Sequence, residues 1–164
     1  MFNKKTLNTL IVSACLCGSG YASADENTNS IVFNVPVQQV YDYVSQPSRW
    51  HEWHPVSLGA DSSSATPLGV GDHFKEQIRL YGQEIEMDYE VVTARPPYEF
   101  KTAFTSSLID GTIHYQLEEV DGGTRFTRTL NYSIDKYIAS LKDGMQEVSG
   151  VALNNLKAKL EEQH

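Results

Sequence analysis

Apolar and polar residues alternate along much of the chain, and this period of two predicts a protein built mainly of β-strands. In 73–80, Phe74, Ile78 and Leu80 share one face with Glu76, and polar residues occupy the other face. Seven segments alternate in this way or form compact apolar runs: 31–35, 56–61, 73–80, 85–91, 98–104, 113–117 and 126–132. The pattern predicts an antiparallel sheet with one buried face and one solvated face.

The dipeptide Tyr81-Gly82 separates two alternating segments and predicts a two-residue hairpin. Closing the chain there places Arg79 opposite Glu84 and Lys75 opposite Asp88 on the polar face. Cross-strand pairs of opposite charge each contribute about 0.2–1 kcal/mol. We therefore interpret the acidic residues of the second strand as a solvated sheet face with basic neighbours, and not as an acidic site.

Helical spacing predicts three further elements. Pro36 stands where a helix begins, and the apolar residues of 37–44 recur at three and four. Residues 49–54 predict a second short helical turn, and Asp135 is the expected cap of a long helix. The apolar stripe of that helix comprises Ile138, Leu141, Met145, Val148, Ala152, Leu156 and Leu160.

These elements predict a single α+β domain at 31–162, preceded by a polar leader at 25–30. An antiparallel sheet with one apolar face has to cover that face, and only the long C-terminal helix is large enough. We therefore expect a curved antiparallel sheet of six to seven strands wrapped round this helix, with two short helices near the N-terminus. Such an arrangement leaves a space between sheet and helix.

The first 24 residues resemble a secretory signal. Lys4 and Lys5 precede a mostly apolar segment, and 22–24 supplies the small residues that a signal peptidase accepts. Cleavage after Ala24 would place the mature chain in the periplasm or outside the cell. A second interpretation is a bacterial lipobox at 12–15, in which Cys15 would carry a lipid anchor.

The charge, cysteine content and hydropathy of the chain limit the kinds of partner and site that we expect. The chain contains 13 basic and 21 acidic residues, a net charge of −8, which disfavours nucleic acid as a partner. Both cysteines, Cys15 and Cys17, lie in the expected signal, so cleavage would leave neither a disulfide nor a thiolate site. No later stretch has the roughly 18–20 apolar residues of a transmembrane span. The oligomeric state does not follow from the sequence.

Two charged residues, Glu76 and Arg128, interrupt otherwise apolar strand faces. A hairpin at Asp121-Gly122, expected as a type I′ turn, places Tyr115 opposite Arg128 on the inner face, with Tyr132 nearby. A lone buried charge is unfavourable, so both residues require a partner or a polar cavity. They either orient the polar end of a mostly apolar ligand, form an internal ion pair or a link to the helices without a ligand role, or act as acid and base.

The segment Trp50-His51-Glu52-Trp53-His54 brings two indoles and two imidazoles together. These rings either close over or stack on a ligand, or the two indoles pack the short helix onto the sheet. The two histidines do not form a His-Glu-x-x-His motif, and we expect neither a metal nor another cofactor. The predicted ligand-binding residues are Trp50, Trp53, His54, Glu76, Tyr89, Phe104, Tyr115, Arg128, Tyr132 and Met145.

Several segments together resemble the START-like helix-grip superfamily (SRPBCC), in particular its polyketide cyclase/dehydrase and lipid-transport branch. They are 35–44 (VPVQQVYDYV), 48–55 (SRWHEWHP), 70–76 (VGDHFKE), 123–128 (GTRFTR) and the end of the chain from 152 to 161. The resemblance covers roughly 31–161. It implies a helix-grip fold that holds a lipid, sterol, polyketide or similar molecule between sheet and helix, and it carries no catalytic set.

Three function classes follow from these observations. The first is a periplasmic or secreted carrier or sensor of a hydrophobic small molecule. The second is an enzyme of the cyclase, dehydratase or isomerase type that uses Glu76, Tyr115, Arg128 or His54. The third is an interaction module with a filled core. An internal cavity of roughly 300 Å³ or more would favour the first two, and a perturbed titrating group inside it would favour the enzyme.

Overall fold

The computed structural model describes residues 25–61, 67–134 and 142–162. The elements in chain order are β1 (Asp25–Phe33), α1 (Val37–Val44), η1 (Pro47–Glu52), β2 (Ser57–Asp61), β3 (His73–Leu80), β4 (Gln83–Arg95), β5 (Glu99–Thr105), β6 (Ile109–Val120), β7 (Gly123–Ile134) and α2 (Lys142–Glu161). The expected signal at 1–24, with Cys15 and Cys17, lies outside the described residues, and so does the expected helix start at Asp135.

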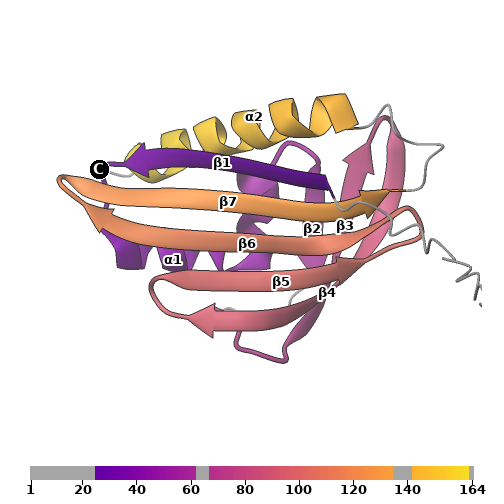
Figure 1. Ribbon diagram of the computed structural model, residues 1–164, viewed down its shortest axis with the longest axis horizontal. Helices are drawn as coiled ribbons and strands as arrows, with labels where there is room; N and C mark the ends of the chain where they lie inside the picture. Colours follow the sequence, from indigo (N-terminus) through magenta and orange to yellow (C-terminus); the bar gives the residue numbers. More distant parts are fainter. Residues whose placement is uncertain (1–24, 62–66, 135–141, 163–164) are drawn as a thin grey trace, which may run out of the picture.

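The strands form one seven-stranded antiparallel sheet in the order β1-β7-β6-β5-β4-β3-β2. A shift of register between Val91 and Thr93 marks a bulge in β4, and bulges of this kind bend a sheet. Figure 1 shows the curved sheet, with α2 running beside β1 and α1 behind the strands. The predicted α+β helix-grip fold is confirmed.

Both predicted hairpin registers are confirmed. In the first turn, Tyr81 (φ 50°) and Gly82 (φ 80°) both adopt the left-handed conformation that a type I′ turn requires. In the second turn only Gly122 does so, with φ 83°. The type I′ turn expected at 121–122 is therefore wrong, because Asp121 stays outside the left-handed region and the glycine alone adopts it.

The polar leader expected at 25–30 is instead part of a strand. β1 begins at Asp25 and pairs along its whole length with β7. The Thr28 and Thr129 hydroxyls lie 3.0 Å apart across this pair, and the Ser30 hydroxyl lies 3.1 Å from that of Thr127. The ladder forms through backbone groups, so it does not require the apolar alternation from which the strand boundary was predicted.

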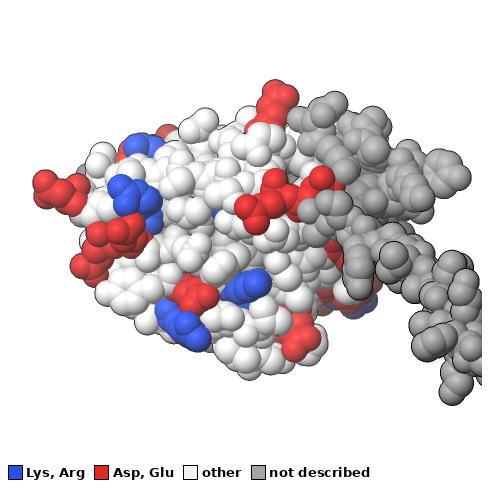
Figure 2. Space-filling view, viewed as in Figure 1, with Lys and Arg blue, Asp and Glu red and all other residues white. Residues whose placement is uncertain are grey.

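The acidic residues of β4 lie on the solvated face, as predicted. Glu84 pairs with Arg79, and Lys75 pairs with both Glu86 and Asp88. On the face of the molecule that Figure 2 shows, acidic and basic side chains of the described residues are scattered singly or in small groups.

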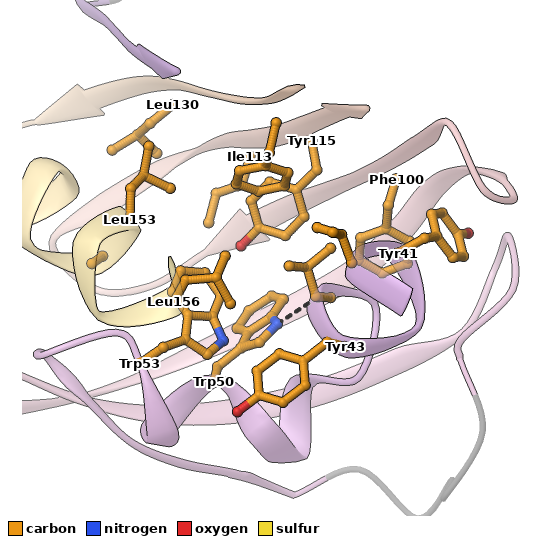
Figure 3. Close-up of a cluster of buried hydrophobic side chains, with 14 of the residues drawn as sticks. Tyr41, Tyr43, Trp50, Trp53, Phe100, Ile113, Tyr115, Leu130, Leu153 and Leu156 are labelled. Atoms are coloured by element: carbon orange, nitrogen blue, oxygen red, sulfur yellow. Dashed lines mark hydrogen bonds between the residues drawn. The ribbon is translucent and has the colours of Figure 1, made fainter. Parts of the chain in front are cut away.

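The helix α2 covers the inner face of the sheet with one apolar stripe. Ala152, Leu153, Leu156 and Leu160 are buried, and Figure 3 shows Leu153 and Leu156 directed toward side chains of the sheet and of η1. At the start of the helix, a Cβ on Gly144 would lie 2.1 Å from the Tyr81 hydroxyl, so the glycine permits the β3–β4 hairpin to touch α2. No helix within the described ranges combines the length and hydropathy needed to cross a membrane.

Candidate functional site

A cavity of about 70 Å³ lies between the inner face of the sheet and the first half of α2. Its wall consists of Trp50, His54, Val56, Glu76, Ile78, Leu80, Met87, Tyr89, Phe104, Ile109, Ile113, Tyr115, Arg128, Leu130, Met145, Val148 and Ser149. Most of these side chains are buried, but six of the residues are only partly buried: His54, Val56, Ile78, Leu80, Met145 and Val148. Four of these six, Ile78 and Leu80 on β3 and Met145 and Val148 on α2, mark the part of the rim between β3 and α2.

The cavity is smaller than the roughly 300 Å³ expected for a pocket that encloses a drug-sized ligand. An apolar cavity of about 150 Å³ is large enough to bind benzene. In this conformation the space therefore fits only a few water molecules or a very short organic molecule. A larger ligand requires the rim between β3 and α2 to widen.

Glu76 lies in the cavity wall with only 4% of its surface exposed. Alternation along β3 directs it inward between Phe74 and Ile78, and the neighbouring strand β4 supplies its partner. The Tyr89 hydroxyl donates a hydrogen bond of 2.9 Å to the Glu76 Oε2 atom. Burial raises the pKa of Glu76 from 4.5 to about 7, although hydrogen bonding and the charge of Arg128 oppose this rise. Near neutral pH this carboxyl group can therefore hold or release a proton.

Arg128 lies in the same wall and is 3% exposed. Its Nη1 atom donates a hydrogen bond of 3.0 Å to the Ser149 hydroxyl on α2. The Asn27 amide on β1 donates to the same hydroxyl at 3.4 Å. The Arg128 Nε–H group is buried and has no hydrogen-bond partner among the described residues. The two hydrogen bonds to the Ser149 hydroxyl join β1, β7 and α2 beside the cavity.

The remaining titratable groups of the wall are held neutral. Burial, and then the charge of Arg128, lowers the pKa of His54 from 6.5 to about 3, although the residue as a whole is only partly buried. Burial raises the pKa of Tyr115 to about 12, and Arg128 opposes that rise. Burial likewise raises the pKa of Tyr89 well above its usual value. The polar wall thus combines one permanent positive charge with neutral donors and acceptors.

The two tryptophans have different places. The Trp50 indole lines the cavity, donates a hydrogen bond of 2.8 Å to the Val44 carbonyl and packs edge-on against Tyr89. Trp53 is 1% exposed and packs against Tyr115 (Figure 3). It is absent from the cavity wall and joins η1 to the sheet, the alternative packing role considered for this residue.

The structure brings eight of the ten predicted site residues together in the cavity wall: Trp50, His54, Glu76, Tyr89, Phe104, Tyr115, Arg128 and Met145. Trp53 and Tyr132 are buried but lie outside it. Tyr132 shares the inward face of β7, but on that strand the cavity ends at Leu130. Ligand binding by these residues stays a prediction.

The sequence pattern singled out neither Ser149, the partner of Arg128, nor most of the apolar wall. Ser149 lies within the apolar stripe of α2, four residues after Met145 and three before Ala152. A polar residue at such a position signals a buried hydrogen bond. The other wall residues that were missed are Val56, Ile78, Leu80, Met87, Ile109, Ile113, Leu130 and Val148.

The described residues contain no group of three or more His, Cys, Asp or Glu side chains that could hold a metal ion. Of the two histidines near η1, His51 is exposed, whereas His54 lines the cavity.

Solved structures share this fold. Protein CV1439 from Chromobacterium violaceum superimposes with a TM-score of 0.68 at 15% identity, covering 83% of this chain and 96% of its own. Protein Ms6760 from Mycobacterium smegmatis has a TM-score of 0.65 at 22% identity, with 85% and 92% covered. A conserved protein from Geobacillus kaustophilus has a TM-score of 0.69 at 14% identity, with 85% and 97% covered. At such identities the likeness concerns the fold alone.

No curated protein matches the chain significantly in sequence. The family described as "Polyketide cyclase / dehydrase and lipid transport" does match, over residues 26–161. This range spans the sheet, the short helices and α2, including every residue of the cavity wall. The chain belongs to the polyketide cyclase/dehydrase and lipid transport family, with the ligand-binding type of helix-grip domain.

Proposed function

We propose that this protein is a carrier that binds a hydrophobic small molecule in the cavity between its sheet and α2. The observation that carries the proposal is the composition of the wall, in which an apolar surface surrounds two buried charged residues, Glu76 and Arg128. Ligand sites commonly combine a mostly apolar lining with a few convergent polar groups that fix orientation. The family description, which includes lipid transport, supports the same function.

In this proposal the apolar part of the ligand contacts Phe104, Ile113 and Leu130. The hydrophobic effect stabilises it there, because its apolar surface is removed from water. Each Å² of apolar surface buried contributes about 25 cal/mol. The polar part lies toward Arg128 and Glu76, the only Asp, Glu, Lys or Arg side chains among the described residues of the wall. Because the closed cavity measures only about 70 Å³, binding of a lipid-sized ligand is accompanied by outward movement of the rim.

The alternative is an enzyme of the cyclase or dehydratase type on the same scaffold. Glu76 is the specific observation that favours it, because a carboxyl group whose pKa is raised to about 7 can act as a general acid or base near neutral pH. Arg128 would then stabilise negative charge that develops on a substrate oxygen. A carrier releases its ligand unchanged, whereas an enzyme changes the ligand's mass or structure.

Native mass spectrometry of the protein as purified from its own cells tests the carrier proposal. A co-purifying organic molecule is expected, and its extraction identifies the ligand class. Ile113→Phe, which places a larger side chain in the cavity wall, is expected to reduce occupancy. Val151→Phe on the exposed face of α2 is the matched control and should retain the ligand.

A ligand-free mass, combined with failure to bind a fluorescent hydrophobic probe such as 8-anilinonaphthalene-1-sulfonate, would refute the carrier and favour an interaction module. Conversion of the extracted compound by wild-type protein, but not by Glu76→Gln, would establish the enzyme instead.

We also propose that residues 1–24 direct export and are removed after Ala24. The basic residues Lys4 and Lys5, the apolar segment and the small residues at 22–24 support this. Intact-mass analysis of protein recovered from the periplasm or the medium is expected to show a chain that begins at Asp25. A diacylglycerol-modified chain beginning at Cys15 would establish the lipid anchor instead, and an unprocessed chain would refute both.

A further inference from the structure

Among the residues that the structure describes, Arg128 is a buried cation without a contacting anion. Its guanidinium is 3% exposed, and its neighbours are neutral: the Ser149 hydroxyl accepts a hydrogen bond from Nη1, and the Tyr115 hydroxyl lies beside the group. The Nε–H group has no acceptor, and no carboxylate of the described residues lies within ion-pair distance. Buried charges in proteins are normally paired and fully hydrogen-bonded.

The acidic group of the wall does not fill this role. The Glu76 carboxylate accepts its hydrogen bond from Tyr89 and interacts with Arg128 only through space. Its pKa of about 7 leaves it partly or fully protonated at and below neutral pH. His54, with a pKa of about 3, and the tyrosine hydroxyls carry no charge there. The wall therefore has a net positive charge centred on Arg128.

We propose that the ligand is an apolar monocarboxylate whose carboxylate lies against Arg128 and supplies the missing counter-charge. This inference rests on the proposed carrier function and specifies its ligand class. A single acidic group is expected because Arg128 is the one permanently charged group of the described wall, and most of the remaining wall, including Ile113, Leu130 and Phe104, is apolar. Acids of a few carbons fit the closed cavity, and longer chains extend past the rim at Leu80 and Met145.

Matched acids and alcohols test the ligand class directly. Isothermal titration calorimetry on the full-length protein at about pH 6 compares the straight-chain acids from propanoate to octanoate with the alcohols of the same chain length. At this pH Glu76 is mostly protonated while the acids are ionised. Because hydrogen bonds to charged groups are the stronger ones, the carboxylate should bind roughly 10- to 100-fold more tightly than its alcohol.

Arg128→Met should remove this preference while alcohols still bind, since an apolar side chain of similar length preserves the packing. Arg125→Met is the matched control: Arg125 is exposed on the same strand, pairs with Glu118, and should leave the preference unchanged. If Arg128→Met does not fold, Arg128→Lys replaces it. The ammonium retains the charge, so a preference for the acid must persist.

The outcomes separate the two proposals. If alcohols bind as tightly as acids, or if Arg128→Met keeps the preference for the acid, the monocarboxylate inference is overturned while the carrier function stands. If neither acids nor alcohols bind and the protein carries no native ligand, the carrier function fails as well.

Discussion

Glu76→Gln isolates the energetic effect of a buried carboxyl group. The residue is 4% exposed, and its pKa in the folded protein is about 7 against an ordinary value of 4.5. Between these pH values the unfolded chain has released the proton that the folded chain still holds. The stability of the wild type therefore falls as pH rises from 4.5 through 7. Glutamine cannot ionise, and its carbonyl oxygen can still accept the hydrogen bond from Tyr89.

The expected magnitude follows from the two pKa values. One pKa unit corresponds to about 1.4 kcal/mol, so the full shift destabilises the wild type by about 3 kcal/mol above pH 7. At pH 5 the same effect is about 1 kcal/mol. The free energy of unfolding of Glu76→Gln, relative to wild type, should therefore rise by about 2 kcal/mol between pH 5 and pH 8. His54 contributes a slope of opposite sign below pH 6.5, but it is present in both proteins and cancels.

Urea unfolding at pH 5 and pH 8, followed by tryptophan fluorescence and far-ultraviolet circular dichroism, measures this difference. Glu90→Gln serves as the control, because Glu90 is exposed on the outer face of the adjacent strand. Its stability should follow the wild type at both pH values. If the wild type and Glu76→Gln change in parallel, to within about 0.5 kcal/mol, Glu76 is ionised in the folded state and the reasoning is refuted.

Three further substitutions test packing in the sheet, in α2 and at the cavity wall. Gly111→Ala would place a Cβ 2.1 Å from the Asn131 carbonyl oxygen and should lower the free energy of unfolding by about 1–3 kcal/mol. In Gly150→Ala the added Cβ has no atom within 4 Å, so the free energy of unfolding should rise by about 0.5–1 kcal/mol. Equal shifts of the melting temperature in the two variants would contradict this. Trp50→Phe removes the donor to the Val44 carbonyl and part of the cavity wall. Urea unfolding should therefore show a free energy of unfolding lower by about 1–3 kcal/mol. An unchanged midpoint would show that the Trp50 hydrogen bond does not stabilise the fold.

Local sequence determined the sheet and its inner face. Strict alternation along β3 and β7, with turn dipeptides at fixed positions, leaves one register that buries the apolar side chains, and a slip by one residue would expose them all. For this reason Glu76 and Arg128 were correctly predicted to face inward, and Tyr115 was correctly paired with Arg128. The start of β1 was not predictable in this way, because backbone pairing with β7 requires no apolar pattern.

The extent of the cavity was decided only by the tertiary structure. Alternation gives the face on which Tyr132 and Leu130 lie, but the position of α2 determines that the cavity wall includes Leu130 and not Tyr132. The sequence likewise shows only that both tryptophans lie in one short helical segment. Packing of that segment against the sheet places Trp50 in the cavity wall and Trp53 in the core. Periodicity specifies the direction of a side chain, whereas a cavity depends on the distance between elements that the chain brings together from far apart.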